Sequence, residues 1–362
     1  MTKSKHHFVP KLYLRAFQSA PKRVHLYNLT TSAAIENASL RDQCYKRRFY
    51  GPTNQTEDNL AVLEGHIAPV LQSIAADNAL PAAGSEEHEI LLAFVALQLL
   101  RTTAAAKRVN VGIDKMMKQA YSHDPRLADV DMEAVEFGYE DPVLASLHNL
   151  PLMLHAISDL RPHLVVSTEK AFLTSDNPAF KYNQYCEEIQ HMGIRGALNR
   201  GLQIFVPLAP QLQLVLYDGT TYKVGLSGRS SRTSIATRSD VDRLNAIQLV
   251  SAEQNVYFSS WQQVEDVRRL IPEIRHHRNT DPIVVQEYGQ DDNPNASLLH
   301  EFERTPYLKL RLSFLSLKWR ARQVPLHARS RDYRMEIPMP PVPEPPHLSG
   351  RSVTFSRFLG RR

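Results

Sequence analysis

The stretch that decides the fold reads Ile90-Leu91-Leu92-Ala93-Phe94-Val95-Ala96-Leu97-Gln98-Leu99-Leu100. Gln98 is its single polar residue. A helix that is apolar on every side normally lies in the centre of a protein. Eleven residues are too few to cross a bilayer, so the sequence predicts a protein without a membrane segment.

The segments on both sides of this stretch have the spacing of helices. From Glu57 to Ala76, apolar residues recur at intervals of three and four. Ser85 is a suitable N-cap, because it precedes a glutamate-rich first turn, and residues 85–121 are expected to form one long helix or two joined helices. With a further helix expected over 142–160, the pattern predicts a central helical bundle.

Strand patterns occupy the two ends of the domain. Residues 23–29 alternate between polar and apolar and predict a strand, paired with a short second strand near Ile35 in a small N-terminal hairpin unit. In the C-terminal half, residues 164–167 and 171–174 flank a turn, and 203–208 and 211–217 form a pair around Ala209-Pro210. These patterns predict an α+β fold with an antiparallel sheet in the C-terminal half.

The chain divides by composition into a large domain and two basic extensions. Residues 1–280 are expected to form one α+β domain, with a basic N-terminal unit (1–52), a helical part (53–160) and a strand-rich part (161–280). Residues 281–336 form a basic extension. Residues 337–362 form a basic tail that begins with six prolines between Ile337 and Pro346. Such a tail is expected to be extended and disordered.

Composition excludes several classes of protein. The chain has 362 residues, 43% of them hydrophobic, and only two distant cysteines, Cys44 and Cys186. A disulfide scaffold and a cysteine-rich zinc module are therefore excluded, and a cytoplasmic location is expected. The polar N-terminus has no apolar run of the kind that signal peptides carry. Because G-x-S-x-G, P-loop, Rossmann and HExxH patterns are missing, no organic cofactor is predicted.

Charge is distributed unevenly along the chain. Residues 1–50 carry 10 Lys and Arg against 2 Asp and Glu, residues 51–300 carry 20 against 31, and residues 301–362 carry 13 against 5. Basic termini suit nucleic acid or another phosphate-bearing ligand. The cluster Lys46-Arg47-Arg48, among Tyr45, Phe49 and Tyr50, has the composition of a nucleic-acid surface. A solvated basic face is the alternative.

Adjacent histidines at the N-terminus are candidates for chemistry. A neutral imidazole is a good metal ligand and a good general base. His6 and His7 would point in opposite directions on an extended segment, so only one of them faces a given site. In the alternative interpretation, His7 packs beneath the short helix predicted over 9–18.

Charged residues in apolar surroundings are the other candidates. Glu57 and Glu64 are two helical turns apart and share a face. Arg101 interrupts an apolar helix and needs a partner, either an anionic ligand or a salt bridge to Glu57, Glu64 or Asp176. Asp176 follows an apolar strand, where it could bind a metal or simply form a tight turn.

The order of several short motifs resembles a family of bacterial proteins, the domain of unknown function DUF4238. The motifs are His6-His7-Phe8-Val9-Pro10, Phe49-Tyr50-Gly51, a helix that bears glutamates, Gln98-Leu99-Leu100-Arg101-Thr102, Thr174-Ser175-Asp176-Asn177-Pro178 and Val206-Pro207-Leu208-Ala209-Pro210. The resemblance covers roughly residues 5–275. It implies no activity, but it suggests that His7, Glu57, Glu64, Arg101 and Asp176 meet in space.

Two functional hypotheses follow for such a polar group. In the first, the chain is a nuclease or phosphoesterase. His6, His7, Glu57, Glu64 and Asp176 are then the candidate ligands of a Mg²⁺ or Mn²⁺ ion. His7, Arg101 and Asp176 are the catalytic residues: His7 activates water and Arg101 stabilises the developing phosphoryl charge. In the second, the chain is a non-catalytic anion sensor or interaction module. An open cleft around these residues favours the enzyme, and closed salt bridges favour the sensor.

Overall fold

The computed structural model describes residues 4–122, 124–188, 193–225, 230–235, 237–278, 281–290, 293–304, 306 and 308–323. The proline-rich tail and residues 324–336 of the predicted basic extension lie outside these ranges. Helices and antiparallel strand pairs alternate along the chain, and the predicted α+β class is confirmed.

The apolar stretch forms the buried helix α3 (Glu86–Leu100). The Ser85 hydroxyl accepts a hydrogen bond from the His88 N–H at 3.2 Å, as expected of an N-cap. Helix α4 (Thr103–Tyr121) follows after a break at Arg101 and Thr102, where the chain bends by 56°. Within the described part of the chain, no single helix has the length and apolar character to span a membrane, although α3 and α4 together do.

Five strands form the larger sheet, in the order β11-β5-β9-β8-β7. All neighbours are antiparallel except β11 and β5, which are parallel. The strands are β5 (Arg161–Ser167), β7 (Phe180–Tyr182), β8 (Gln203–Ala209), β9 (Leu212–Tyr217) and β11 (Arg232–Ile235). The predicted pairing of two strands around Ala209-Pro210 is therefore confirmed.

A second sheet joins distant parts of the chain, in the order β3-β2-β12-β6. Its strands are β2 (Arg23–Asn28), β3 (Ala33–Ser39), β6 (Thr174–Ser175) and β12 (Asn255–Phe258). The predicted N-terminal hairpin is present as β2 and β3, and β12 extends it into a sheet. The expected strands 164–167 and 171–174 belong to different sheets, because β5 pairs with β9 and β6 pairs with β12.

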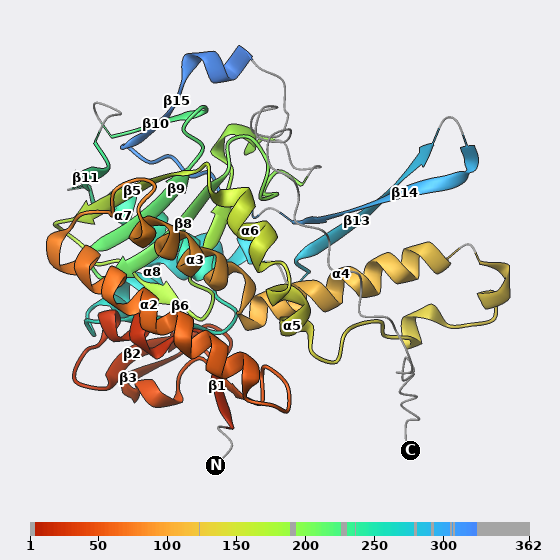
Figure 1. Ribbon diagram of the computed structural model, residues 1–362, viewed down its shortest axis with the longest axis horizontal. Coiled ribbons are helices and arrows are strands. Elements are labelled where there is room, and N and C mark those ends of the chain that lie inside the picture. Colours follow the sequence, from red (N-terminus) through yellow and green to blue (C-terminus); the bar gives the residue numbers. More distant parts are fainter. Residues whose placement is uncertain are drawn as a thin grey trace.

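Three two-stranded ladders complete the strands. They are β1 (Lys5–His7) with β4 (Tyr45–Arg47), β10 (Tyr222–Val224) with β15 (Leu315–Leu317), and β13 (Ile283–Gln290) with β14 (Asn293–Glu303). The β13–β14 hairpin projects from the body beside the outer part of α4 (Figure 1). Residues 281–323, beyond the predicted domain, thus contribute strands to the fold.

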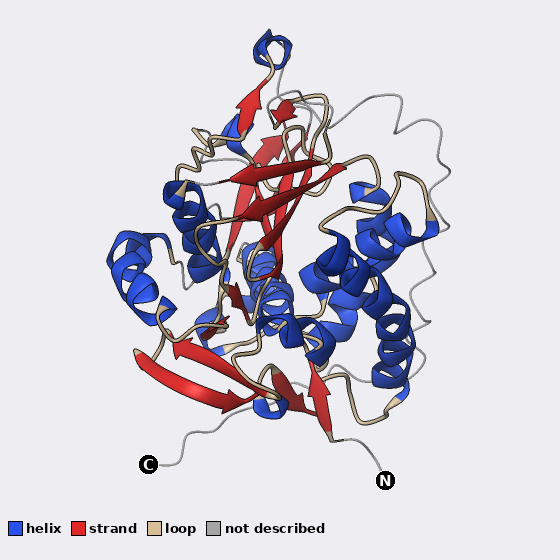
Figure 2. Cartoon of the chain, turned by 90° about the vertical axis from the view of Figure 1, so that its left-hand side faces the viewer, coloured by secondary structure: helices blue, strands red, loops and turns tan. Residues whose placement is uncertain are grey.

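The remaining helices cover the sheets. They are α1 (Lys11–Leu14), α2 (Gln55–Asp77), α5 (Pro142–Leu147), α6 (Leu150–Ile157), α7 (Arg238–Ser251) and α8 (Gln263–Ile274). Groups of helices flank the strands on two sides (Figure 2). Phe94 of α3 shares one core with Leu164, Ile204 and Leu214 of the larger sheet. A separate central helical bundle is therefore not confirmed. Helix α3 is apolar on every side because it packs against other helices and also against the larger sheet.

Candidate functional site

Arg101 lies at the break between α3 and α4, and its side chain is only 1% exposed. Its Nη1 donates to Glu64 Oε1 at 2.9 Å, its Nη2 donates to the His7 carbonyl at 2.7 Å, and its Nε donates to the Tyr50 hydroxyl at 3.2 Å. The Tyr50 hydroxyl donates in turn to the same His7 carbonyl at 3.1 Å. Each nitrogen of the guanidinium therefore has a partner within the protein, and the predicted salt bridge to Glu64 is present.

Both histidines are buried, and both hold the N-terminal strand in place. The His7 Nε2 donates to the Arg41 carbonyl at 3.2 Å, and burial lowers the pKa of His7 to about 4. The His6 ring stacks on Tyr50 at 5.6 Å between centroids, and its Nδ1 accepts the Tyr50 backbone N–H at 3.1 Å. The group that links β1, Tyr50, Glu64 and Arg101 is thus closed by hydrogen bonds.

Asp176 holds a loop instead of joining this group. Its carboxylate accepts three backbone N–H groups, from Glu253 at 2.8 Å, Gln254 at 2.8 Å and Asn255 at 2.9 Å. Burial raises the pKa of Asp176 to about 6 even though these donors oppose the rise. In the described part of the chain, no hydrogen bond or ion pair joins Asp176 to His7, Glu64 or Arg101.

Three of the five residues that the family resemblance groups therefore meet directly, namely His7 through its carbonyl, Glu64 and Arg101. Glu57 lies two turns before Glu64 on α2, and its charge reaches the Tyr50 hydroxyl closely enough to help raise the pKa of Tyr50, which burial raises most. Within the described ranges, no three His, Cys, Asp or Glu side chains are grouped so that they could hold a metal ion. The divalent metal and its ligand set stay predictions.

A large cavity lies elsewhere, where α4, α6 and the β13–β14 hairpin meet. Its volume is about 690 Å³, within the usual range of small-molecule sites. Its apolar lining consists mainly of Leu99, Leu100, Val109, Leu152, Met153, Leu198 and Ile283. Leu152 and Leu198 are each 43% exposed, so they form an apolar rim that faces solvent. The cavity therefore has an apolar wall and an open side.

Charged residues close one wall of this cavity. Arg108 of α4, Lys181 of β7 and Glu303 of β14 line both the cavity and a smaller hollow of about 100 Å³ behind it, and Arg195 lines the hollow. Lys181 Nζ donates to Glu303 Oε1 at 2.6 Å. Arg108 Nε lies 3.7 Å from Glu303 Oε1, and Arg195 Nη2 lies 3.6 Å from Glu303 Oε2. Three cations thus surround one carboxylate.

The electrostatics of this basic wall, defined as Arg108, Lys181 and Arg195, are unbalanced. Burial alone would raise the pKa of the Glu303 carboxyl, but the three cations outweigh it and hold that pKa well below its usual range. Burial lowers the pKa of Lys181 and that of Arg195. Arg195 is 9% exposed, and its buried Nε has no hydrogen-bond partner among the described residues. A second carboxylate, Glu301 of β14, also lines the cavity, and burial and the charge of Glu303 raise its pKa. Three cations against two carboxylates still leave one positive charge in excess, together with an unused donor, which suits an anion.

Only one residue of this wall stands out in the sequence. Lys181 stands between Phe180 and Tyr182 on a buried strand, a polar residue in apolar surroundings like Arg101, and that signal could have been used. Glu303 lies beyond the stretch that resembles the family. No local pattern indicates that it pairs with a lysine 122 residues away.

Comparisons with known proteins give one match. A family model described as a protein of unknown function, DUF4238, matches residues 5–262, which include the three cations of the basic wall but not Glu303. No curated protein and no solved structure matches the chain.

Proposed function

The chain belongs to the DUF4238 family, whose description names no activity, and on this premise we propose that it is a non-catalytic binding module for a small amphipathic anion. The ligand would place an apolar body in the 690 Å³ cavity and a carboxylate or phosphate group against Arg108, Lys181 and Arg195.

The observation that carries this proposal is the imbalance of the basic wall. Three cations surround Glu303, Glu301 is the second carboxylate of the cavity, and the buried Arg195 Nε has no hydrogen-bond partner among the described residues. The Arg195 Nη atoms donate to the Lys181 and Arg304 carbonyls, so only the Nε donor is unsatisfied. A buried donor without a partner costs about 1–3 kcal/mol. An anion that reaches this wall would receive charge-assisted hydrogen bonds, which are about twice as strong as neutral ones.

The shape of the ligand follows from the rest of the cavity. Val109, Met153 and Ile283 offer only apolar contacts, so a fully hydrated ion such as free phosphate would leave most of the volume without favourable contacts. An apolar chain or ring with a single acidic end fits both the apolar lining of the cavity and its basic wall. The rim formed by Leu152 and Leu198 favours a ligand that enters with its apolar body outermost.

The state of the predicted polar group also supports binding over catalysis. Arg101 and Glu64 are engaged with each other, and Asp176 is engaged with a loop. The His7 ring nitrogen Nε2 donates to a carbonyl. Closed contacts of this kind favour the sensor hypothesis over an open hydrolytic cleft.

The test is a ligand titration of the purified full chain, followed by calorimetry and thermal unfolding. The probes are decanoate and decyl phosphate, with decanol as the uncharged analogue. We expect both anions to raise the melting temperature. At a ligand concentration of 100 times Kd, the free energy of unfolding should increase by about 2.7 kcal/mol, whereas decanol should have little effect. Absence of binding by both anions would overturn the proposal.

A matched pair of variants separates loss of the site from loss of stability. Lys181→Met removes from the basic wall a lysine whose side chain is 12% exposed. Lys170→Met removes a buried lysine that pairs with Asp242 and Asp266 between α7 and α8, away from the cavity. Both variants should unfold at lower temperature, but only Lys181→Met should lose its response to decanoate. Equal responses in the two variants would count against the assigned wall.

Metal-assisted hydrolysis stays a prediction from the sequence, and a direct assay tests it. The protein is incubated with plasmid, RNA and nucleotides in the presence of Mg²⁺ or Mn²⁺. Turnover by the wild type that His7→Ala abolishes would support the nuclease or phosphoesterase hypothesis over the binding module. If neither protein shows turnover under any condition, that hypothesis fails.

A further inference from the structure

Six cations gather around the short β1–β4 ladder, at a distance along the chain from the cavity. They are Lys5, Lys11, Arg41, Lys46, Arg47 and Arg48. On the ladder, Lys5 pairs with Arg47 and His6 with Lys46, and the Arg48 N–H donates to the Ser4 carbonyl at 3.0 Å. Because successive side chains of a strand point to opposite sides, Lys46 and Arg47 project on the two sides of β4, and both are exposed. We call these six cations around the ladder the β1–β4 cationic face.

The positions of the other cations of the face follow from their contacts with His7 and from their charges close to it. The Arg41 carbonyl accepts the His7 Nε2 hydrogen bond. Burial is the main cause of the low pKa of His7, and the charges of Lys11 and Lys5 lie close enough to lower it further. Lys5 thus lies on β1, Lys11 lies near His7, and the backbone of Arg41 contacts the same strand.

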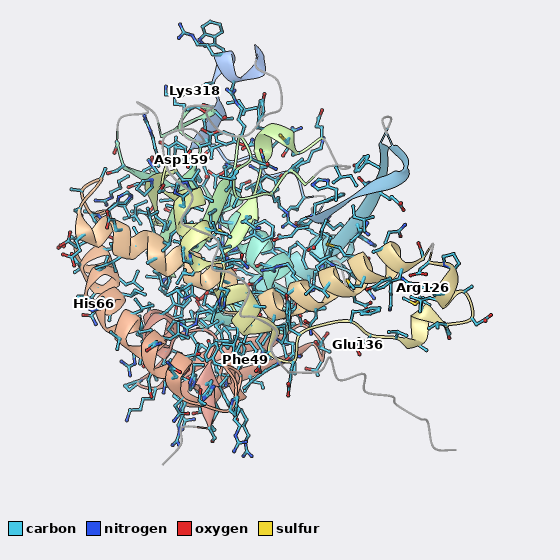
Figure 3. The ribbon with its side chains drawn as sticks, turned by 45° about the vertical axis from the view of Figure 1, so that its right-hand side comes forward. Phe49, His66, Arg126, Glu136, Asp159 and Lys318 are labelled. Carbon is cyan, nitrogen blue, oxygen red and sulfur yellow. The ribbon has the colours of Figure 1, made fainter. Side chains whose placement is uncertain are left out.

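Little negative charge balances this face. Asp42 forms an ion pair with Lys5 at 2.7 Å. Lys46, Arg47 and Arg48 are exposed and, among the described residues, have no carboxylate within ion-pair distance. Figure 3 shows nitrogen-tipped side chains projecting from the molecule beyond Phe49. Such an excess of exposed charge repels itself and is relieved by a partner with regularly spaced negative charges.

Two aromatic rings support the cations from below. Lys5 Nζ lies 4.3 Å from the centroid of the Tyr45 ring, and Lys46 Nζ lies 5.8 Å from that of Phe49. The rings are half-buried and covered by these cations, so they direct ammonium groups outward and are not themselves open for base stacking. The face therefore suits phosphates of a backbone more than exposed bases.

We propose that the β1–β4 cationic face binds the phosphate backbone of nucleic acid without reading its sequence. Arg41, Arg47 and Arg48 supply planar donors that match phosphate oxygens in pairs. An anionic membrane is the less suitable partner, because membrane-surface binders combine basic residues with exposed apolar ones. In residues 4–52, Ile35 on β3 is the large apolar side chain that is most exposed, and it lies outside the face. This inference does not depend on the proposed ligand of the cavity.

The experiment measures binding of the full chain to a fluorescent 20-base-pair DNA duplex at several salt concentrations. We expect the logarithm of the affinity to fall linearly with the logarithm of the salt concentration. The variant Lys46→Gln/Arg47→Gln/Arg48→Gln should bind at least about tenfold more weakly at 0.1 M salt, and its slope should be smaller by about 2–3, since each lost phosphate contact removes about 0.9.

A control variant with the same change of charge makes the result specific. Lys223→Gln/Arg232→Gln/Arg320→Gln removes three exposed cations from β10, β11 and the helical turn after β15, at the other end of the molecule from β1 (Figure 1). It should bind the duplex like the wild type. Equal weakening of both variants, or an unchanged slope in the β4 variant, would overturn the proposal. So would binding to vesicles that contain phosphatidylserine without binding to DNA.

Discussion

The Lys181 ammonium of β7 lies 2.6 Å from the Glu303 carboxylate of β14, although the two residues are 122 positions apart. This contact attaches the strand that leaves the β13–β14 hairpin to the edge of the larger sheet. Glu303 is also the carboxylate that lies within ion-pair distance of all three cations of the basic wall, since Arg108 and Arg195 approach the same side chain. Glu303 therefore stabilises the empty wall and competes with any anion that enters.

Glu303→Gln separates these two effects. Removal of the carboxylate leaves three cations without their shared counter-charge, so the ligand-free variant should be less stable to unfolding. The loss should be below the 3–5 kcal/mol of a fully buried pair, because the side chains of Arg108 and Glu303 are 22% and 23% exposed. The same change removes the internal competitor, so the variant should bind decanoate more tightly than the wild type. Calorimetry at pH 7 and urea unfolding measure the two quantities. Weaker binding by Glu303→Gln would show that Glu303 positions the cations and does not compete.

Arg101→Met tests whether the closed polar group is structural. The variant keeps the bulk of the side chain but removes the donor to the Glu64 carboxylate and one of the two donors to the His7 carbonyl, which keeps its hydrogen bond from the Tyr50 hydroxyl. We expect a loss of about 3–5 kcal/mol in the free energy of unfolding. Glu64→Gln should lose less, because the Glu64 side chain is 24% exposed and water can reach it. If Arg101→Met is as stable as the wild type, a role in ligand binding becomes the better explanation of this buried cation.

His7→Gln tests the effect of burial on the pH dependence of stability. The pKa of His7 is about 4 in the folded protein, below the ordinary value of about 6.5 in an unfolded chain. The unfolded state therefore takes up a proton first, and the contribution of His7 to stability, present above pH 6.5, is lost as the pH falls toward 4. The stability difference between wild type and His7→Gln should shrink over that interval in urea unfolding.

A second histidine variant provides the control for this pH series. His66 lies on the exposed side of α2 (Figure 3), so His66→Gln should leave the pH profile of the wild type unchanged. A profile for His7→Gln that runs parallel to that of the wild type would contradict the proposed burial effect.

The sequence predicted local features of this molecule better than the distant ones. Ser85 caps its helix, as the glutamates that follow it indicate. Glu64, which pairs with Arg101, is one of the three carboxylates that the sequence offered as partners for a buried arginine. The first prediction rests on the turn that follows Ser85 in its own helix, and the second rests on the cost of burying an unpaired charge.

The candidate site was harder to predict, because its residues come from elements that meet only in three dimensions. Asp176 follows a strand as a metal ligand would, and equally as a loop anchor would, and only the position of residues 253–255 decides between the two. The basic wall depends on where the β13–β14 hairpin docks against α4. Neither arrangement produces a periodic pattern of residues or a characteristic spacing of motifs that could be recognised in the sequence.

Asp176→Asn tests the loop-anchor role, and its pH dependence should have the opposite sign to that of His7. An asparagine offers one acceptor oxygen where the carboxylate offers two, so we expect the free energy of unfolding to fall by roughly 2–3 kcal/mol, within the range of a hydrogen bond to a charged group.

The pKa of Asp176 in the folded protein is about 6, above the ordinary value of an aspartate, so the folded state holds an extra proton between pH 4 and 6. The contribution of Asp176 is therefore largest below pH 4 and decreases as the pH rises through 6. Urea unfolding of both proteins from pH 4 to 7 should show their stability difference narrowing with rising pH. A difference that widens would mean that the three backbone donors outweigh burial and that the carboxylate is ionised throughout this range.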